Sequence, residues 1–185
     1  ISMDLPERLG SLGLTSDEEW LVCAFASGFA LFNTQTGEQD WLNKTEPRYR
    51  GIRMNDGRVD AKGNFWAGSM IEDAALAGDA TGTLYRQSPD GTVTHHREGI
   101  VISNAICFPP HGNSLYFADT PTGELLELPL RDEGTVGPAM QFASVQGPGY
   151  PDGAIVDAEG CLWNAEWGAS QLTAYWPDGS IRHHV

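Results

Sequence analysis

Hydrophobic residues along this chain come in short runs, and glycine, proline, aspartate or asparagine stand between the runs. Aromatic and branched residues are frequent within them, as in Trp20 to Ala24 and Phe29 to Asn33. Runs of this kind predict short β-strands separated by turns. The longest apolar stretch, Trp20 to Phe32, is interrupted by Ser27-Gly28. It therefore predicts two strands rather than a membrane span, which needs about 18 consecutive apolar residues.

This pattern repeats along the chain. Three similar stretches place Asp56, Asn104 and Asp152 at one repeat position, each 48 residues after the one before. A repeat of roughly 40–50 residues that contains several strands is typical of β-propeller blades. The sequence therefore predicts one all-β propeller domain over 1–185, with blades at approximately 8–50, 51–99, 100–148 and 149–185.

The two ends of the chain bear on whether this propeller is whole. Closed propellers have roughly four to eight blades of four strands. Ile1 to Glu7 resembles the outer strand of a preceding unit, and the last unit stops at Val185, directly after its outer strand. We expect four consecutive blades of a longer, apparently partial propeller; a free-standing four-bladed ring is the alternative.

Two hairpins carry paired histidines. Pro89 to His96 matches Pro177 to His184 almost letter for letter, 88 residues further on. Asp-Gly between alternating strands is a strong hairpin signal. Neighbouring side chains on a strand face opposite ways, so His95 and His96 are not predicted to bind one metal ion together. Both segments are predicted to be exposed edge strands.

One segment departs from the repeat. Ile71 to Thr81 stands where a tight hairpin belongs, and it is rich in alanine after the acids Glu72 and Asp73. This pattern predicts a helical turn inside a longer loop. Functional sites are often built on such loops.

The charge and the cysteines narrow the possible partners and location. The chain has 25 Asp and Glu against 11 Lys and Arg, a formal net charge of −14, which disfavours nucleic acid and anionic membranes as partners. Cys23, Cys107 and Cys161 lie far apart in apolar runs, so buried free thiols are predicted. No signal peptide is visible, which favours a cytoplasmic location, although a sequence that does not open on Met leaves room for a preceding segment.

Oxygen-bearing side chains stand at the repeat positions. Asn55, Asp56, Asn104 and Asp152 all precede predicted inner strands, and inner strands line the central channel of a propeller. Converging carboxylate and amide oxygens suit a hard divalent cation such as Ca²⁺, Mg²⁺ or Mn²⁺, and suit Zn²⁺ less well. Alternatively, Asn-Asp-Gly and Pro-Asp-Gly are ordinary turns whose side chains cap their own backbone.

Three ordered motifs cover nearly the whole chain. They are Arg53-x-Asn55-Asp56-Gly57 continuing to Ala67-Gly68-x-Met70, then Ser103-Asn104, then Pro151-Asp152-Gly153 continuing to Leu162-Trp163. Together these motifs resemble the SMP-30/gluconolactonase/LRE-like family. The resemblance implies a six-bladed propeller, of which this chain covers about four blades. It also implies divalent-metal-dependent hydrolysis of a small-molecule sugar lactone to the aldonic acid.

The resemblance also implies roles for individual residues. Asn104 and Asp152 fall on two of the family's metal ligands, while the third, a glutamate in a Glu-Gly-Pro-x-Trp motif, is missing from this chain. The implied cofactor is one divalent ion, Ca²⁺, Zn²⁺, Mg²⁺ or Mn²⁺, and Asp152 would also act as the catalytic base. Substrate contacts fall on Arg53, Asn55 and Asp73.

One position inside the motifs departs from the family. Ala105 follows Asn104 where the family commonly has glycine. If this position needs a left-handed backbone, alanine strains it by roughly 1 kcal/mol.

Two other functions remain as alternatives. A non-catalytic calcium-binding or interaction propeller would keep the metal without the chemistry. Arg53-x-Asn55 with an acid at Asp73 argues against it, because a structural metal does not need them. The other alternative is a paraoxonase-like hydrolase on a related propeller.

Overall fold

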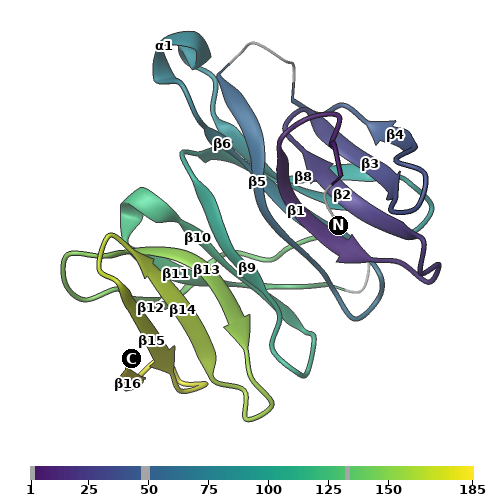
Figure 1. Ribbon diagram of the computed structural model, residues 1–185. Coiled ribbons are helices and arrows are strands. Elements are labelled where there is room, and N and C mark those ends of the chain that lie inside the picture. The colour runs from purple at the N-terminus through teal and green to yellow at the C-terminus, as the bar shows by residue number, and fades with distance from the viewer. Residues whose placement is uncertain (1–2, 47–50, 132–133) are drawn as a thin grey trace. The chain divides into compact units, whose positions relative to one another are not determined.

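The computed structural model describes residues 3–46, 51–131 and 134–185, and within them the protein is built almost entirely of β-strands. The prediction of an all-β chain is confirmed. The strands form four antiparallel sheets of four strands each, and every sheet joins its strands in sequence order (Figure 1). Contacts divide the chain into two compact units, residues 1–100 and 101–185.

The first unit holds two sheets and one short helix. The first sheet contains β1 (Leu9–Leu14), β2 (Trp20–Phe25), β3 (Gly28–Asn33) and β4 (Gln39–Asn43). The second sheet contains β5 (Ile52–Val59), β6 (Phe65–Ile71), β7 (Gly82–Gln87) and β8 (Val93–Ile100), with α1 (Ala74–Ala77) between β6 and β7. The helical turn predicted within 71–81 is thus confirmed.

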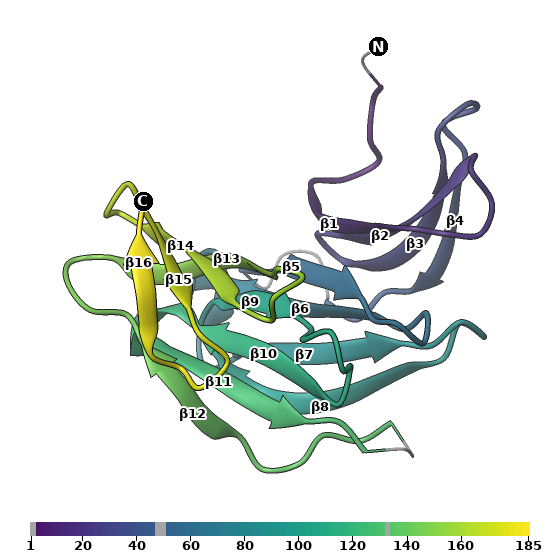
Figure 2. The same cartoon turned by 90° about the horizontal axis from the view of Figure 1, so that it is seen from below.

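The second unit also holds two sheets. The third sheet contains β9 (Ser103–Cys107), β10 (Ser114–Asp119), β11 (Glu124–Pro129) and β12 (Met140–Ser144), with the 3-10 turn η1 (Thr120–Thr122) after β10. The fourth sheet contains β13 (Tyr150–Val156), β14 (Leu162–Trp167), β15 (Gln171–Tyr175) and β16 (Ile181–His184). Within each of these sheets the strands lie side by side in chain order (Figure 2).

An aspartate and a tryptophan brace the first hairpin in two of the sheets. Asp60 Oδ1 accepts the backbone N–H of Asn64, and Asp60 Oδ2 accepts the indole N–H of Trp66 at 2.9 Å. Asp157 is bonded in the same way to the backbone N–H of Cys161 and to the indole N–H of Trp163, the latter at 2.8 Å. The indole hydrogen bond is the main cause that lowers the pKa of Asp157.

Side chains from both sheets of a unit fill its core. In the first unit Val22, Ala24 and Phe29 of the first sheet pack with buried residues of the second sheet, namely Met54, Phe65, Ala67 and Tyr85. In the second unit the core is formed by Ala105, Cys107, Tyr116, Ala118, Leu125, Ala143, Ala154, Leu162 and Tyr175.

Several smaller predictions can be compared with the structure. Cys23, Cys107 and Cys161 are all free and buried, as predicted. His95 packs against Tyr85 and His96 against Trp66, so the two histidines face opposite sides of the edge strand β8, as expected. In the described part of the chain, no helix is long and apolar enough to cross a membrane.

The predicted blade limits include residue 50, which lies outside the described residues. The assignment of 1–185 to one propeller domain stays a prediction. An outer strand over Ile1 to Glu7 is not found, because residues 3–7 form no strand and residues 1–2 are not described. The carboxylate of Glu7 instead accepts the backbone N–H and the hydroxyl of Ser27.

Candidate active site

All four inner strands carry a β-bulge near the same repeat position. In each of β1, β5, β9 and β13 one more residue lies between two cross-strand pairs than on the partner strand. The extra residue falls at Gly10, Asn55-Asp56, Ala105-Ile106 and Asp152-Gly153. Bulges re-aim side chains and are frequent beside active sites. Asn55 and Asp152 therefore stand where the backbone departs from regular pairing, and Asn104 directly precedes such a position.

In the second unit a chain of hydrogen bonds links Asn104 to the segment that carries Asp152. Asn104 is buried, with 6% of its surface exposed, and its Nδ2 donates to Thr120 Oγ1 at 2.9 Å. The hydroxyl of Thr120 donates in turn to the carbonyl of Pro151 at 2.8 Å. Since the Nδ2 end of the amide is held by Thr120, the Oδ1 end is fixed in direction as well. The structure thus brings two predicted metal ligands to neighbouring strands.

Asn164 of β14 supports the Pro151-Asp152-Gly153 segment from another side. Its Nδ2 lies 3.3 Å from the carbonyl oxygen of Asp152 and 3.5 Å from that of Gly153. Its Oδ1 is fully buried and has no hydrogen-bond partner within the described residues. Burying an amide oxygen without a hydrogen-bond donor costs free energy. Asn164 Oδ1 is therefore an oxygen that a bound water or ion could satisfy.

The chemistry of this donor set fits a hard divalent cation. Asp152 is half-buried and contributes a carboxylate, and Asn104 contributes an amide oxygen. Carboxylate and amide oxygens are ligands that Ca²⁺ and Mg²⁺ prefer. That Asn104 and Asp152 bind one ion together stays a prediction.

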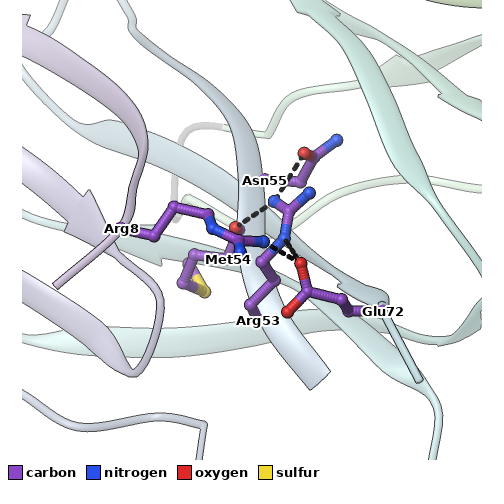
Figure 3. A network of polar contacts seen from close by, with 5 residues as sticks. All are labelled: Arg8, Arg53, Met54, Asn55 and Glu72. Carbon is purple, nitrogen blue, oxygen red and sulfur yellow. Dashed lines mark hydrogen bonds and ion pairs between the residues drawn. The ribbon is translucent and has the colours of Figure 1, made fainter. Parts of the chain in front are cut away.

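In the first unit Arg53 is the centre of a polar network (Figure 3). Its Nε donates to Glu72 Oε1 at 2.8 Å, and its Nη1 donates both to the carbonyl of Met54 at 3.0 Å and to Asn55 Oδ1 at 2.9 Å. Glu72 is also paired with Arg8. Only 19% of the Arg53 side chain is exposed, so its guanidinium is held in one orientation.

Asp73 has a structural task in the same region. It is the N-cap of α1, and its Oδ1 accepts the backbone N–H groups of Ala75 at 2.9 Å and Leu76 at 3.2 Å. The acid that contacts Arg53 is therefore its neighbour Glu72. The sequence Asp-Ala-Ala-Leu carries the usual signal of such a cap. A substrate contact by Asp73 stays a prediction.

Arg53, Glu72 and Asp73 line one cavity of the first unit, of about 510 Å³. Glu7, Ser27 and Leu76 belong to the same wall. Two of the three predicted substrate-contacting residues, Arg53 and Asp73, thus face a common space, and Asn55 is bonded to Arg53.

The sequence alone did not point to three residues that hold these sites. Thr120 couples Asn104 to Pro151, and Glu72 with Arg8 holds Arg53. Glu72 directly precedes Asp73, which was predicted to contact the substrate, so an acid at this position could have been considered as a partner of Arg53. Nothing in the sequence pairs Thr120 or Arg8 with these partners, because both contacts join distant segments.

One other group of potential ligands lies in the second unit. The ligand atoms of Asp157, Glu159 and Cys161 all lie within 4.8 Å of one another. However, the guanidinium of Arg182 contacts both Glu159 and Cys161, and Asp157 is bonded to the hairpin backbone and Trp163. A cation there would meet the positive charge of Arg182, so this group is better described as an ion pair beside a brace.

Comparison with known proteins identifies the class. The chain matches the SMP-30/gluconolactonase/LRE-like region over residues 1–185 and belongs to that family. It is 37% identical over 177 residues to L-arabinolactonase of Azospirillum brasilense, covering 95% of this chain and 58% of that protein. It is 34% identical over 189 residues to 6-deoxy-6-sulfogluconolactonase of Pseudomonas putida, covering 100% of this chain and 62% of that protein.

A solved structure gives the same result for the fold. The calcium-binding protein regucalcin of Agrobacterium tumefaciens superimposes with a TM-score of 0.89 at 33% identity, covering 98% of this chain and 61% of that one. The four sheets therefore match about three fifths of a propeller of this family. The chain spans less than two thirds of the length of the relatives that it matches.

Proposed function

We propose that the protein is a sugar lactonase that uses one divalent cation to hydrolyse a sugar lactone to its aldonic acid. The observation that carries this proposal is the hydrogen-bonded link from Asn104 through Thr120 to the Pro151-Asp152 segment. It orients the amide of Asn104 and ties it to the backbone of the strand that carries Asp152. Family membership and relatives named as lactonases support the same activity.

In this proposal Asn104 and Asp152 hold the cation, which when bound supplies Lewis-acid polarisation of the lactone carbonyl. Asp152 accepts a proton from the water as the water oxygen bonds to the carbonyl carbon. It then gives this proton to the ring oxygen as the bond between the carbonyl carbon and the ring oxygen breaks. Arg53 donates hydrogen bonds to the sugar hydroxyls, and the amide of Asn55 bonds to them as well, which fixes the orientation of the ring. A cytoplasmic location belongs to the same proposal.

The test is a hydrolysis assay on a panel of five- and six-membered aldonolactones, with and without chelator. We expect hydrolysis of at least one lactone, loss of that activity with chelator, and its return with one of Ca²⁺, Zn²⁺, Mg²⁺ or Mn²⁺. Hydrolysis that survives complete removal of metal would contradict the mechanism.

A second candidate function is calcium binding without catalysis, which the description of the Agrobacterium protein as calcium-binding favours. The same panel separates the two. Calcium binding measured by calorimetry together with no hydrolysis of any lactone would support this second function.

A further inference from the structure

Arg53 has most of its hydrogen-bonding capacity already engaged. A guanidinium carries five N–H donors. One on Nε is bonded to Glu72, and the two on Nη1 are bonded to Met54 O and Asn55 Oδ1. The two donors on Nη2 have no partner among the described residues, and no dashed line reaches this amino group in Figure 3. Arg53 therefore offers a single NH₂ group in a fixed direction.

The charge of Arg53 is offset by the residue that holds it. The carboxylate of Glu72 contacts Nε of Arg53 and is shared with Arg8, whose side chain is 62% exposed. A charge opposed at contact distance keeps its hydrogen-bond donors but projects a weaker field onto a ligand. The Arg8 charge is largely screened by solvent.

Most of the charged groups in the described lining of the 510 Å³ cavity are acidic. Glu7 and Asp73 line it together with Glu72, while Arg53 is the one lining residue with a positive charge among those described. Lys44 lies 3.5 Å from Glu7 and offsets that carboxylate only in part. Among the described lining residues, a ligand in this cavity thus meets hydrogen-bonding groups with no excess of positive charge.

We infer that Glu72 is a positioning and specificity-determining residue, which holds Arg53 for neutral sugar hydroxyls and disfavours lactones that carry a phosphate, sulfonate or carboxylate. This inference rests on the proposed function, because it concerns the substrate class of the same site. Specificity of this kind comes from a repulsive element that acts against the wrong ligand. Here the repulsive element is a carboxylate that also performs a positioning task.

Two substitutions separate the two tasks of Glu72. Glu72→Gln keeps an oxygen that can accept from Arg53 Nε but removes the negative charge. Glu72→Ala removes both. Glu159→Gln is the matched control, because Glu159 is likewise an exposed carboxylate paired with an arginine, Arg182 at 2.6 Å, and lies outside the cavity.

The first measurement is the ratio of kcat/KM for glucono-1,5-lactone to that for its 6-phosphate. We expect the unmodified protein to prefer the neutral lactone, and Glu72→Gln to shift the ratio toward the phosphate by roughly threefold to tenfold, which is the size of one partly screened charge interaction. Glu72→Ala should raise KM for the neutral lactone, whereas Glu72→Gln should keep it close to the KM of the unmodified protein. Glu159→Gln should leave the ratio unchanged.

The second measurement does not need turnover. Calorimetric Kd values for glucitol and glucitol 6-phosphate should follow the same order in the same four proteins. If no protein hydrolyses any lactone but the Kd ratio shifts with Glu72→Gln, the proposed function fails and the charge selectivity stands. If hydrolysis is found but the unmodified protein accepts the phosphate equally well, or Glu72→Gln leaves both ratios unchanged, the inference is overturned while the lactonase remains.

Discussion

The second sheet, β5–β8, and the fourth sheet, β13–β16, share their supporting residues and differ in their inner strands. Both brace the first hairpin with an aspartate bonded to an indole, Asp60 to Trp66 and Asp157 to Trp163. Both close their last hairpin with a Pro-Asp-Gly turn in which the aspartate accepts a backbone N–H two residues on. The repeat therefore preserves the residues that make hairpins.

The inner strands carry different chemistry on the same backbone device. The bulge of β5 presents Asn55 beside Arg53, whereas the bulge of β13 presents Asp152. Each bulge redirects a side chain, and the residue at the bulge decides which functional group the sheet contributes to the candidate site. Function in this molecule is thus expected where the repeat varies in side chain while it is constant in backbone.

The strongest way to break this comparison is to exchange a bulge aspartate for alanine. We expect Asp152→Ala to abolish detectable turnover and metal binding, because it removes both a ligand and the proposed base. The control change Asp178→Ala, in an exposed turn, removes only the two hydrogen bonds that Asp178 accepts from Ser180 and should leave both turnover and metal binding intact. Steady-state kinetics and metal titration by calorimetry measure the two. Asp152→Ala with unmodified turnover would contradict the role given to the bulge.

The second prediction concerns the bulge of β5. Arg53→Ala should raise KM for the preferred lactone by roughly tenfold to a hundredfold with a smaller change in kcat, since one charge-assisted hydrogen bond contributes about 1.5–3 kcal/mol. Arg182→Ala removes an arginine paired with a carboxylate in the fourth sheet and is the control. A fall in kcat at constant KM would assign Arg53 to the chemical step instead.

Sequence and structure agree best where the information is local. Turn residues and strand patterns depend on neighbours in the chain, and the 48-residue spacing of Asp56, Asn104 and Asp152 can be counted directly. The four-stranded sheets could therefore be predicted. The sequence also carries a local signal for the capping of α1 by Asp73, although the family resemblance assigned Asp73 to a substrate contact. Local signals predict hairpins well because a short turn joins the two strands that pair.

The supporting contacts of the candidate site could not be predicted in the same way. The partners of Thr120 and of Glu72 include residues far away in sequence, Pro151 for the first and Arg8 for the second. Such pairs depend on how sheets pack within a unit, and no spacing rule encodes them. The bulges escaped prediction too, because one extra residue on a strand leaves no separate signal in an apolar pattern.

The third prediction sharpens the comparison between the two braces. Asp60→Ala and Asp157→Ala should each lower the free energy of unfolding, by about 1–3 kcal/mol, because each removes a carboxylate that accepts several hydrogen bonds. The loss should be larger for Asp60, since Trp66 is 1% exposed and its indole N–H would stay buried without a partner, whereas Trp163 is half-buried. Chemical denaturation measures both. Equal losses would show that indole burial does not decide the cost.

The smallest expected effect concerns the third sheet, where the repeat meets an alanine in an unusual conformation. Ala105 has a φ of 58°, so the left-handed backbone considered from the sequence is found there. Gly57 and Gly153, at the same repeat position, are not among the glycines with positive φ. The third bulge therefore adopts a conformation suited to glycine with a side chain in place.

Three terms decide the effect of Ala105→Gly. Relief of the left-handed strain gains about 1–2 kcal/mol. Greater freedom of the unfolded chain costs about 0.4–1 kcal/mol, and loss of a buried methyl group costs up to about 0.8 kcal/mol. These terms nearly cancel, so we expect a change of less than about 0.5 kcal/mol in the free energy of unfolding.

Ala118→Gly is the matched control, because Ala118 is also fully buried, pairs with Asn104 across the sheet, and has no positive φ. Without strain to relieve, this substitution should cost about 1–2 kcal/mol from the same entropy and burial terms. The difference between the two variants, measured by chemical denaturation, is the strain at Ala105. Equal losses in both would mean that the β9 bulge accepts alanine without strain, and that its backbone is not what distinguishes the third sheet from the second and the fourth.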